Sequence, residues 1–158
     1  MTLDQRNEPF KEPPRSQIPG ISAMHVAAME TSDADEVWVG AGMKQLMLRT
    51  VGRKSGKEHK VALPYWLDPQ GARIVVASFS GAEKNPAWYL NLTDRSANAE
   101  VLVREQHDTY WADPQVLDGD DYRTIWDSLC ADRPYYNEYQ SRTSRRIPLV
   151  RLVRLRDG

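Results

Sequence analysis

A short basic turn carries the residues best suited to binding an anion. Residues 52–57 read Gly-Arg-Lys-Ser-Gly-Lys, so three cations, a hydroxyl and two glycines lie in one stretch. Glycine lets the backbone take positive φ and approach a ligand closely, and exposed N–H groups in a turn can form a concave anion site. A solvated hairpin tip is the alternative, because Lys and Arg are common at loop ends. Taken alone, the turn favours the solvated tip.

Two familiar phosphate-binding motifs are excluded by spacing. A P-loop needs four residues between its glycines, whereas Gly52 and Gly56 enclose three. The stretch that starts at Gly40 follows an apolar run, but Gln45 stands where a dinucleotide-binding fingerprint needs its third glycine. A nucleotide site of either type is therefore not expected.

A second candidate anion site begins at Asn85-Pro86. Asn as the N-cap and Pro as the first helical residue predict a short helix through residues 87–92. The unpaired N–H groups and the macrodipole at a helix start both attract an anion, and Lys84 adds a positive charge beside them. An ordinary capped helix is the alternative interpretation.

Aromatic residues beside cations suggest a pocket for a planar ligand with a phosphate. The chain has five Trp and seven Tyr, and Tyr135, Tyr136 and Tyr139 precede a run of arginines. Aromatic side chains can contact a ring while cations hold the anion. Core packing is a strong alternative for Trp111 and Trp126, but a weaker one for the tyrosine trio, which follows a proline-marked helix start.

The remaining reactive side chains give little support for catalysis by the chain alone. His25, His59 and His107 are far apart and none is paired with another ligand at helical spacing, so no metal site is expected. We interpret these histidines as surface or packing residues. No serine near these motifs has a neighbouring His and Asp, which leaves a hydrolase weakly supported. The single Cys130 excludes an internal disulfide and fits a reducing compartment.

Length and charge limit the other classes of function. We expect residues 1–20 to form a flexible proline-rich arm and residues 21–158 to form one cofactor-binding domain. The net charge of −1 provides no general attraction to nucleic acid or an anionic membrane. No signal peptide and no apolar run of about 18 residues is present. We therefore expect a cytoplasmic protein with at most peripheral membrane contact and no nucleic-acid partner.

The hydrophobic pattern predicts an α+β domain built on a small barrel or a strongly curled sheet. Period-two alternation and turn residues predict six antiparallel strands, at residues 46–51, 59–67, 72–79, 101–103, 107–116 and 147–155. Helices are expected over residues 21–30 and 87–92 and after Asp118 and Pro134.

Three motifs together resemble the deazaflavin-dependent nitroreductases, a branch of the split β-barrel flavin and deazaflavin oxidoreductases. These motifs are residues 50–57, 81–92 and 136–148, and they lie in the family's order and at its spacing. The resemblance implies a six-stranded antiparallel split β-barrel of the FMN-binding type with short flanking helices. It also implies hydride transfer from reduced coenzyme F420 to an electron-poor small molecule such as a quinone or, adventitiously, a nitroaromatic.

The resemblance assigns roles to individual residues. Cofactor-binding residues would be Arg53, Lys54, Ser55, Lys57, Ser78, Phe79, Ser80, Lys84, Pro86, Ala87, Trp88 and Asn91. The acceptor pocket would be shaped by Tyr65, Tyr135, Tyr136 and Tyr139, with Ser78, Tyr136 and Tyr139 as catalytic residues. Because the cofactor supplies the hydride chemistry, the protein need only position two rings and polarise the acceptor by hydrogen bonding.

Some features depart from the resembled family. The family usually has proline where Ala62 stands, a glycine where Ser80 stands and a proline where Glu83 stands. Two other functions remain open from the sequence: an FMN-dependent reductase of the same fold, and a non-catalytic protein that binds a cofactor or lipid. The chain is expected to act as a monomer or a homodimer.

Overall fold

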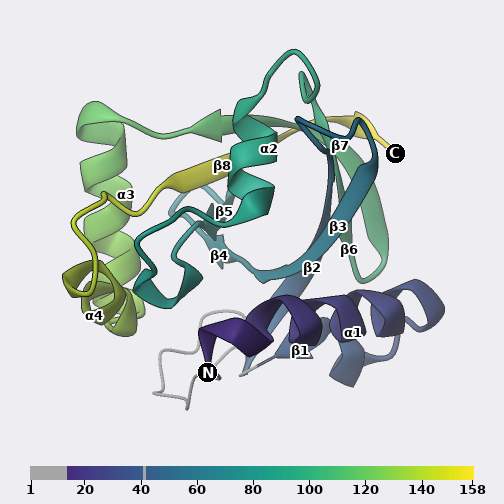
Figure 1. The fold of residues 1–158 in the computed structure, drawn as a ribbon, viewed down its shortest axis with the longest axis horizontal. Helices are drawn as coiled ribbons and strands as arrows, with labels where there is room; N and C mark the ends of the chain where they lie inside the picture. Colours follow the sequence, from purple (N-terminus) through teal and green to yellow (C-terminus); the bar gives the residue numbers. More distant parts are fainter. Residues whose placement is uncertain (1–13, 41) are drawn as a thin grey trace.

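The computed structural model describes residues 14–40 and 42–158, in which an antiparallel sheet curls around a hydrophobic core (Figure 1). The strands are β1 (Val39–Gly40), β2 (Met43–Val51), β3 (Glu58–Pro64), β4 (Trp66–Leu67), β5 (Arg73–Val76), β6 (Val101–Glu105), β7 (Asp108–Val116) and β8 (Leu149–Asp157). Their order is β1-β2-β6-β7-β8-β5-β4, and β3 pairs with β2 along Gln45–Val51, on the edge of β2 opposite to β6.

The helices lie outside the sheet and across its open side (Figure 1). The α-helices are α1 (Ile18–Thr31), α2 (Ala87–Thr93), α3 (Gly119–Asp132) and α4 (Tyr135–Ser141). Short 3₁₀ turns are η2 (Arg15–Gln17), η3 (Asp35–Trp38) and η4 (Phe79–Gly81). None of the helices in the described part of the chain is long and apolar enough to cross a membrane.

The α+β class and the curled antiparallel sheet agree with the sequence analysis, but the strand count does not. Eight strands are present in the described residues, two more than expected. The strand expected over residues 59–67 is divided at Tyr65, since β3 pairs with β2 and β4 pairs with β5. Pro64 ends β3 because it has no N–H to continue the ladder, and the Tyr65 N–H instead donates to the Lys44 carbonyl at 3.2 Å.

The inside of the curled sheet packs against α2. Leu46 and Leu48 of β2 and Val103 of β6 are fully buried, and they share one core cluster with Trp88 and Leu92 of α2. Burying each of these side chains stabilises the fold by about 1.5 to 3 kcal/mol. The core therefore fixes α2, and with it the start of α2, above the opening of the sheet.

A second core cluster lies between α3, α4 and the strands β5 and β8. The helical face predicted after Asp118 is confirmed, because Ile125 and Leu129 are buried against Ile147 and Leu149. Cys130 lies on this face, and burial raises the pKa of its thiol to about 11. Cys130 is therefore a protonated packing residue.

Helix α1 packs along β3. Met29 of α1 shares a cluster with Trp38 and Met47, and the Ala62 N–H donates to Ser22 Oγ at 3.1 Å. The helix begins at Ile18, inside the stretch that was expected to belong to the N-terminal arm. Residues 1–13 of that expected arm lie outside the described part of the chain.

Candidate functional site

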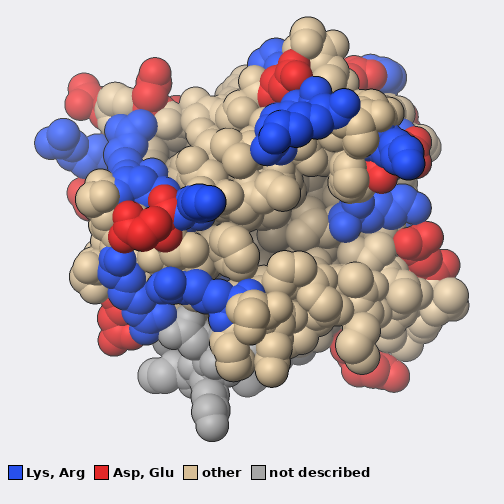
Figure 2. All heavy atoms as spheres, viewed as in Figure 1, with Lys and Arg blue, Asp and Glu red and all other residues tan. Residues whose placement is uncertain are grey.

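One cavity of about 800 Å³ opens on the face where α1, α2 and the tyrosine helix α4 meet. Figure 2 shows the hollow on this face, with Lys and Arg side chains at its right-hand side. Its walls come from β2, β3, the turn between them, the segment around η4, and the three helices. Three sequence motifs that are far apart in the chain therefore contribute to a single space.

The basic turn forms the polar end of the cavity. Arg53 points its Nη1 and its main-chain N–H at Asn91 Oδ1, at 2.7 and 3.3 Å. Ser55 Oγ lies 3.3 Å from His59 Nε2 and accepts a hydrogen bond from the Lys57 N–H at 3.2 Å. The turn is closed by a 2.7 Å bond from the Gly52 N–H to the Lys57 carbonyl. These bonds fix the turn, and with it the Arg53 side chain, at the mouth of the cavity.

Gly52 allows the turn to fold this tightly. A Cβ at this position would lie 2.5 Å from Ser55 Oγ and 2.8 Å from His59 Nε2. Both distances are shorter than a Cβ contact can be, so a side chain at position 52 would displace the Ser55 and His59 side chains from these positions.

The buried Asn98 fixes the turn relative to α2. Its side chain accepts a 2.7 Å hydrogen bond from the Val51 N–H and donates to the Val51 carbonyl at 2.9 Å. It also donates to the main-chain carbonyl of Asn91 at 2.8 Å. Because the end of β2 and the helix α2 share this one amide, the basic turn and the start of α2 keep a fixed geometry.

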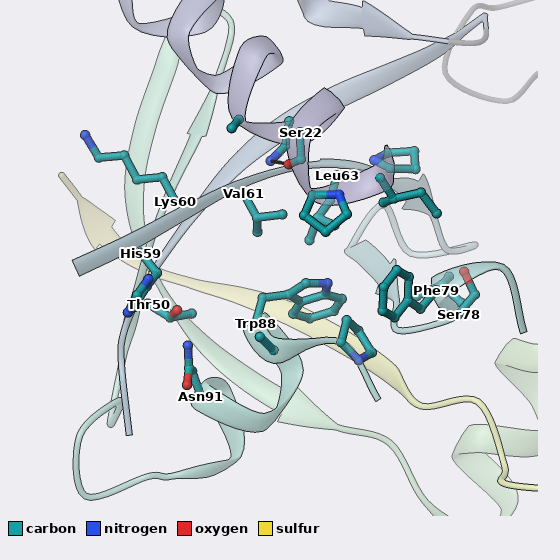
Figure 3. Close-up of a pocket in the computed structure, with 18 of the residues that line it drawn as sticks. Ser22, Thr50, His59, Lys60, Val61, Leu63, Ser78, Phe79, Trp88 and Asn91 are labelled. Atoms are coloured by element: carbon teal, nitrogen blue, oxygen red, sulfur yellow. Dashed lines mark hydrogen bonds between the residues drawn. The ribbon is translucent and has the colours of Figure 1, made fainter. Parts of the chain in front are cut away.

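Thr50 lies under the same polar end and is almost fully buried. Its Oγ1 has no hydrogen-bond partner among the described residues. A buried hydroxyl without a partner costs about 1 to 3 kcal/mol. Figure 3 shows Thr50, His59 and Asn91 at one end of the cavity, Ser78 and Phe79 at the other, and Trp88 between them.

The segment around η4 forms the opposite wall in an uncommon backbone conformation. Phe79 and Ser80 both have positive φ, 43° and 52°, a region that side chains other than glycine rarely adopt. The Ser80 carbonyl accepts hydrogen bonds from Arg15 Nη2 at 3.1 Å and Arg142 Nη1 at 3.3 Å. Such strain persists only where the surroundings enforce it, and it is concentrated at functional sites.

Three tyrosines of α4 close the remaining side. The ring centroids of Tyr135, Tyr136 and Tyr139 lie 4.6 to 5.8 Å apart, so the rings form one packed group. The Tyr135 hydroxyl donates to Met43 Sδ at 3.0 Å. Burial raises the pKa of Tyr135 and Tyr136, so both remain protonated at neutral pH and can donate hydrogen bonds.

Comparison with known proteins places these motifs in one family. The sequence profile of the F420H(2)-dependent quinone reductase family matches residues 22–154. An F420H(2)-dependent quinone reductase of Mycobacterium tuberculosis is 34% identical over 110 residues, which are 69% of this chain and 72% of that protein. The chain belongs to the F420H(2)-dependent quinone reductase family.

Solved structures agree with membership of the quinone reductase family. An F420-H2 dependent reductase named FDR-A has 31% identity and a TM-score of 0.57, covering 68% of this chain and 92% of its own. A domain-swapped dimer has 28% identity and a TM-score of 0.59, covering 83% of this chain and 99% of its own. The family resemblance read from the three motifs is therefore confirmed.

Most residues to which the resemblance to the deazaflavin-dependent nitroreductases assigned a role line the cavity. These are Arg53, Lys54, Ser55, Ser78, Phe79, Ser80, Pro86, Ala87, Trp88, Asn91, Tyr135, Tyr136 and Tyr139. The predicted N-cap is shifted by one residue, because Pro86 occupies that position and Asn85 bonds elsewhere through its side chain.

Three residues that the sequence assigned to the site do not line the cavity. Lys57 and Lys84 are exposed outside it. Tyr65 is only 5% exposed and belongs to the core cluster inside the sheet, because the break after Pro64 turns its side chain inward.

Other cavity residues were missed by the sequence analysis. His59, interpreted as a surface or packing residue, lines the polar end and pairs across the ladder with Thr50. Ile18 and Pro19, assigned to the arm, line the cavity from α1. The signal available for His59 was the alternation of β3, which puts it on the same side as Val61. No group of three or more potential metal ligands occurs within residues 14–40 and 42–158.

The positive φ of Ser80 gives a testable expectation for stability. Exchanging Ser80 for Gly should remove a left-handed strain of about 1 to 2 kcal/mol, partly offset by about 0.5 to 1 kcal/mol of glycine entropy. We therefore expect Ser80→Gly to raise the free energy of unfolding by up to about 1 kcal/mol, measured by urea denaturation. Ser128→Gly, inside α3, should lower it by about 0.5 kcal/mol. Destabilisation by both exchanges would show that Ser80 is not strained.

Proposed function

We propose that this protein is an oxidoreductase that passes a hydride from reduced coenzyme F420 to a quinone. One observation carries the proposal: a single cavity joins the basic turn, the start of α2 and the tyrosine group. The family to which the chain belongs is named for this activity. The cavity volume of about 800 Å³ suits a flat cofactor and a small acceptor held together.

The residues present fit the cofactor. The exposed cations Arg53 and Lys54 suit a phosphate and an acidic tail at the polar end, since charge-assisted hydrogen bonds are the strong ones. A polar group of the ligand at this end would also give the buried Thr50 hydroxyl the partner that the described residues do not provide. Trp88 and Phe79 supply an apolar wall for a ring.

The chain would contribute positioning and hydrogen bonding. When bound, the reduced deazaflavin supplies the hydride and its two electrons. The segment from Ser78 to Ser80 would lie along the ring, and Tyr136 and Tyr139 would shape the acceptor pocket. The Tyr136 hydroxyl is protonated at neutral pH, as any tyrosine is, and burial raises its pKa further, so it could donate a hydrogen bond toward a carbonyl oxygen of the acceptor. Ser78 offers a second hydroxyl on the cavity wall.

The proposal includes the finer features expected from the sequence. The curled sheet supports a split β-barrel of the FMN-binding type, and the residues that line the cavity support the proposed cofactor and acceptor contacts. A relative of 28% identity that forms a domain-swapped dimer supports the homodimer as one of the two expected assembly states.

Direct binding and turnover test the function. Titrating the purified protein with oxidised F420 and following its fluorescence should give saturable binding at micromolar concentrations or below. Adding menadione to protein and reduced F420 should then restore the absorbance of the oxidised deazaflavin faster than in a mixture without protein. FMN is the control ligand and should bind more weakly. Absence of F420 binding would refute the cofactor, and binding without turnover over a panel of quinones would favour a non-catalytic binding protein.

A further inference from the structure

Arg145 makes an unusual set of contacts with the strained wall of the cavity. Its Nη2 donates to the Ser78 carbonyl at 2.8 Å and its Nη1 to the Ala77 carbonyl at 3.1 Å. Its Nε donates to the Ala82 carbonyl at 2.8 Å, and Nη1 also reaches Asn85 Oδ1 at 2.9 Å. One guanidinium thus binds acceptors at both ends of the segment 77–85.

The backbone preferences of its own residues would not hold the segment 77–85 in this shape. Phe79 and Ser80 both occupy the left-handed region, at a cost of about 1 to 2 kcal/mol each for residues other than glycine. Regular secondary structure does not hold the segment in shape either, because its only helical turn is the short η4, which covers Phe79–Gly81. Arg145 binds the carbonyls of Ala77 and Ser78, directly before the two strained residues, and that of Ala82, two positions after them, so it restrains the chain on both sides of the strain.

All four of these acceptors are neutral oxygens. The hydrogen bonds that Arg145 donates to them therefore restrain the geometry of the segment and do not pair opposite charges. A planar guanidinium presents its N–H groups in a fixed fork, and a lysine ammonium cannot reach acceptors spread along nine residues. Ser78 faces the cavity on one side and Arg145 on the other. Arg145 itself does not line the cavity.

We propose that Arg145 is a positioning residue that fixes the segment 77–85 for contact with the deazaflavin ring. This inference rests on the proposed function, because it assigns Arg145 a role only if a ring lies along Ser78, Phe79 and Ser80. It does not concern the phosphate end of the cofactor. Loss of Arg145 would therefore weaken ring binding and misplace the ring relative to the acceptor, while the basic turn stays intact.

Arg95 provides a matched control for the exchange Arg145→Lys. Arg95 also binds two main-chain carbonyls, of Pro114 at 2.6 Å and Ala99 at 2.9 Å, and it bonds Asp113 at 2.7 Å. It does not line the cavity. Arg145→Lys and Arg95→Lys should thus both lower the melting temperature, while only Arg145→Lys should affect the cofactor.

The experiment compares two probes: full F420, and its deazaflavin chromophore with the ribityl chain but without the phosphate and acidic tail. We expect Arg145→Lys to raise Kd for both probes by the same factor, about 10-fold or more, and to lower kcat for menadione reduction. Measurements at 25 °C, below the melting temperature of each variant, separate this effect from unfolding. Arg95→Lys should leave Kd and kcat within about twofold of the parent.

Each outcome bears on one proposal. Suppose that the parent protein binds F420, and that Arg145→Lys has the same Kd for both probes and the same kcat as Arg95→Lys. The positioning role is then wrong, and the proposed function stands. If the parent protein binds neither probe, the proposed function fails. If Arg145→Lys does not fold, Asn85→Ala removes one acceptor of Arg145 and should raise Kd for the chromophore by about two- to fivefold. An unchanged Kd in that variant would overturn the inference.

Discussion

Replacing Arg53 and Lys54 together by alanine is expected to weaken F420 binding by about 100-fold. Both side chains lie at the mouth of the cavity, and Arg53 is held there by its bond to Asn91. A charge-assisted contact contributes about 1.5 to 3 kcal/mol, and the lower end applies because both cations are exposed. Two such contacts correspond to about 3 kcal/mol, which is about two powers of ten in Kd.

A control variant removes the same number of positive charges outside the cavity. Lys57 and Lys84 are exposed and neither lines the cavity, so exchanging both for alanine should change Kd by only a few fold through screened long-range attraction. Titrations between about 50 and 300 mM salt should show a weaker salt dependence in Arg53→Ala/Lys54→Ala than in the parent protein. Equal losses in the two double variants would mean that the tail of F420 binds elsewhere.

Replacing Gly81 by alanine is expected to destabilise the fold by about 3 kcal/mol or more. Gly81 has a φ of 78°, and a Cβ there would lie 2.4 Å from the Tyr139 carbonyl oxygen and 2.9 Å from Arg142 Cβ. Because the close atoms include main chain of α4, the helix itself must move. A loss of this size should lower the melting temperature by roughly 6 to 12 °C in a chain of this length.

Gly71 is a control that separates the cost of left-handed backbone strain from the cost of steric contact. It has a similar φ of 83°, but an added Cβ would meet nothing within 4 Å. Gly71→Ala should therefore cost only the left-handed strain, about 1 to 2 kcal/mol. Calorimetric melting of both variants gives the comparison. If the two exchanges cost the same, the contact between the η4 segment and α4 is looser than the distances indicate.

The parts of the fold that the sequence predicted well are those governed by local pattern. The hairpin of β6 and β7 and the buried face of α3 follow from period-two and helical spacing, which depend on neighbours in the chain. The basic turn at residues 52–57 was visible for the same reason, although its local pattern alone favoured a solvated tip. Arg53 lines the cavity, and it was assigned to the site through the resemblance carried by three motifs together.

The parts that the sequence predicted poorly depend on contacts between distant segments. Tyr65 was assigned to the acceptor pocket, but a break after Pro64 sends it into the core, and that break depends on β4 pairing with β5. His59 is exposed, which agrees with its interpretation as a surface residue, but its place beside Thr50 at the cavity wall depends on the ladder between β2 and β3. The role of Arg145 depends on a segment about 60 residues away.

The contribution of α1 to the cavity matters for anyone who shortens this chain. A truncation at residue 21, at the border expected from composition, would delete Ile18 and Pro19 from the cavity wall and remove the first turn of the helix that carries Ser22. Recombinant versions that retain Pro14 and the residues after it keep Ile18 and Pro19 in the cavity wall and preserve the start of α1.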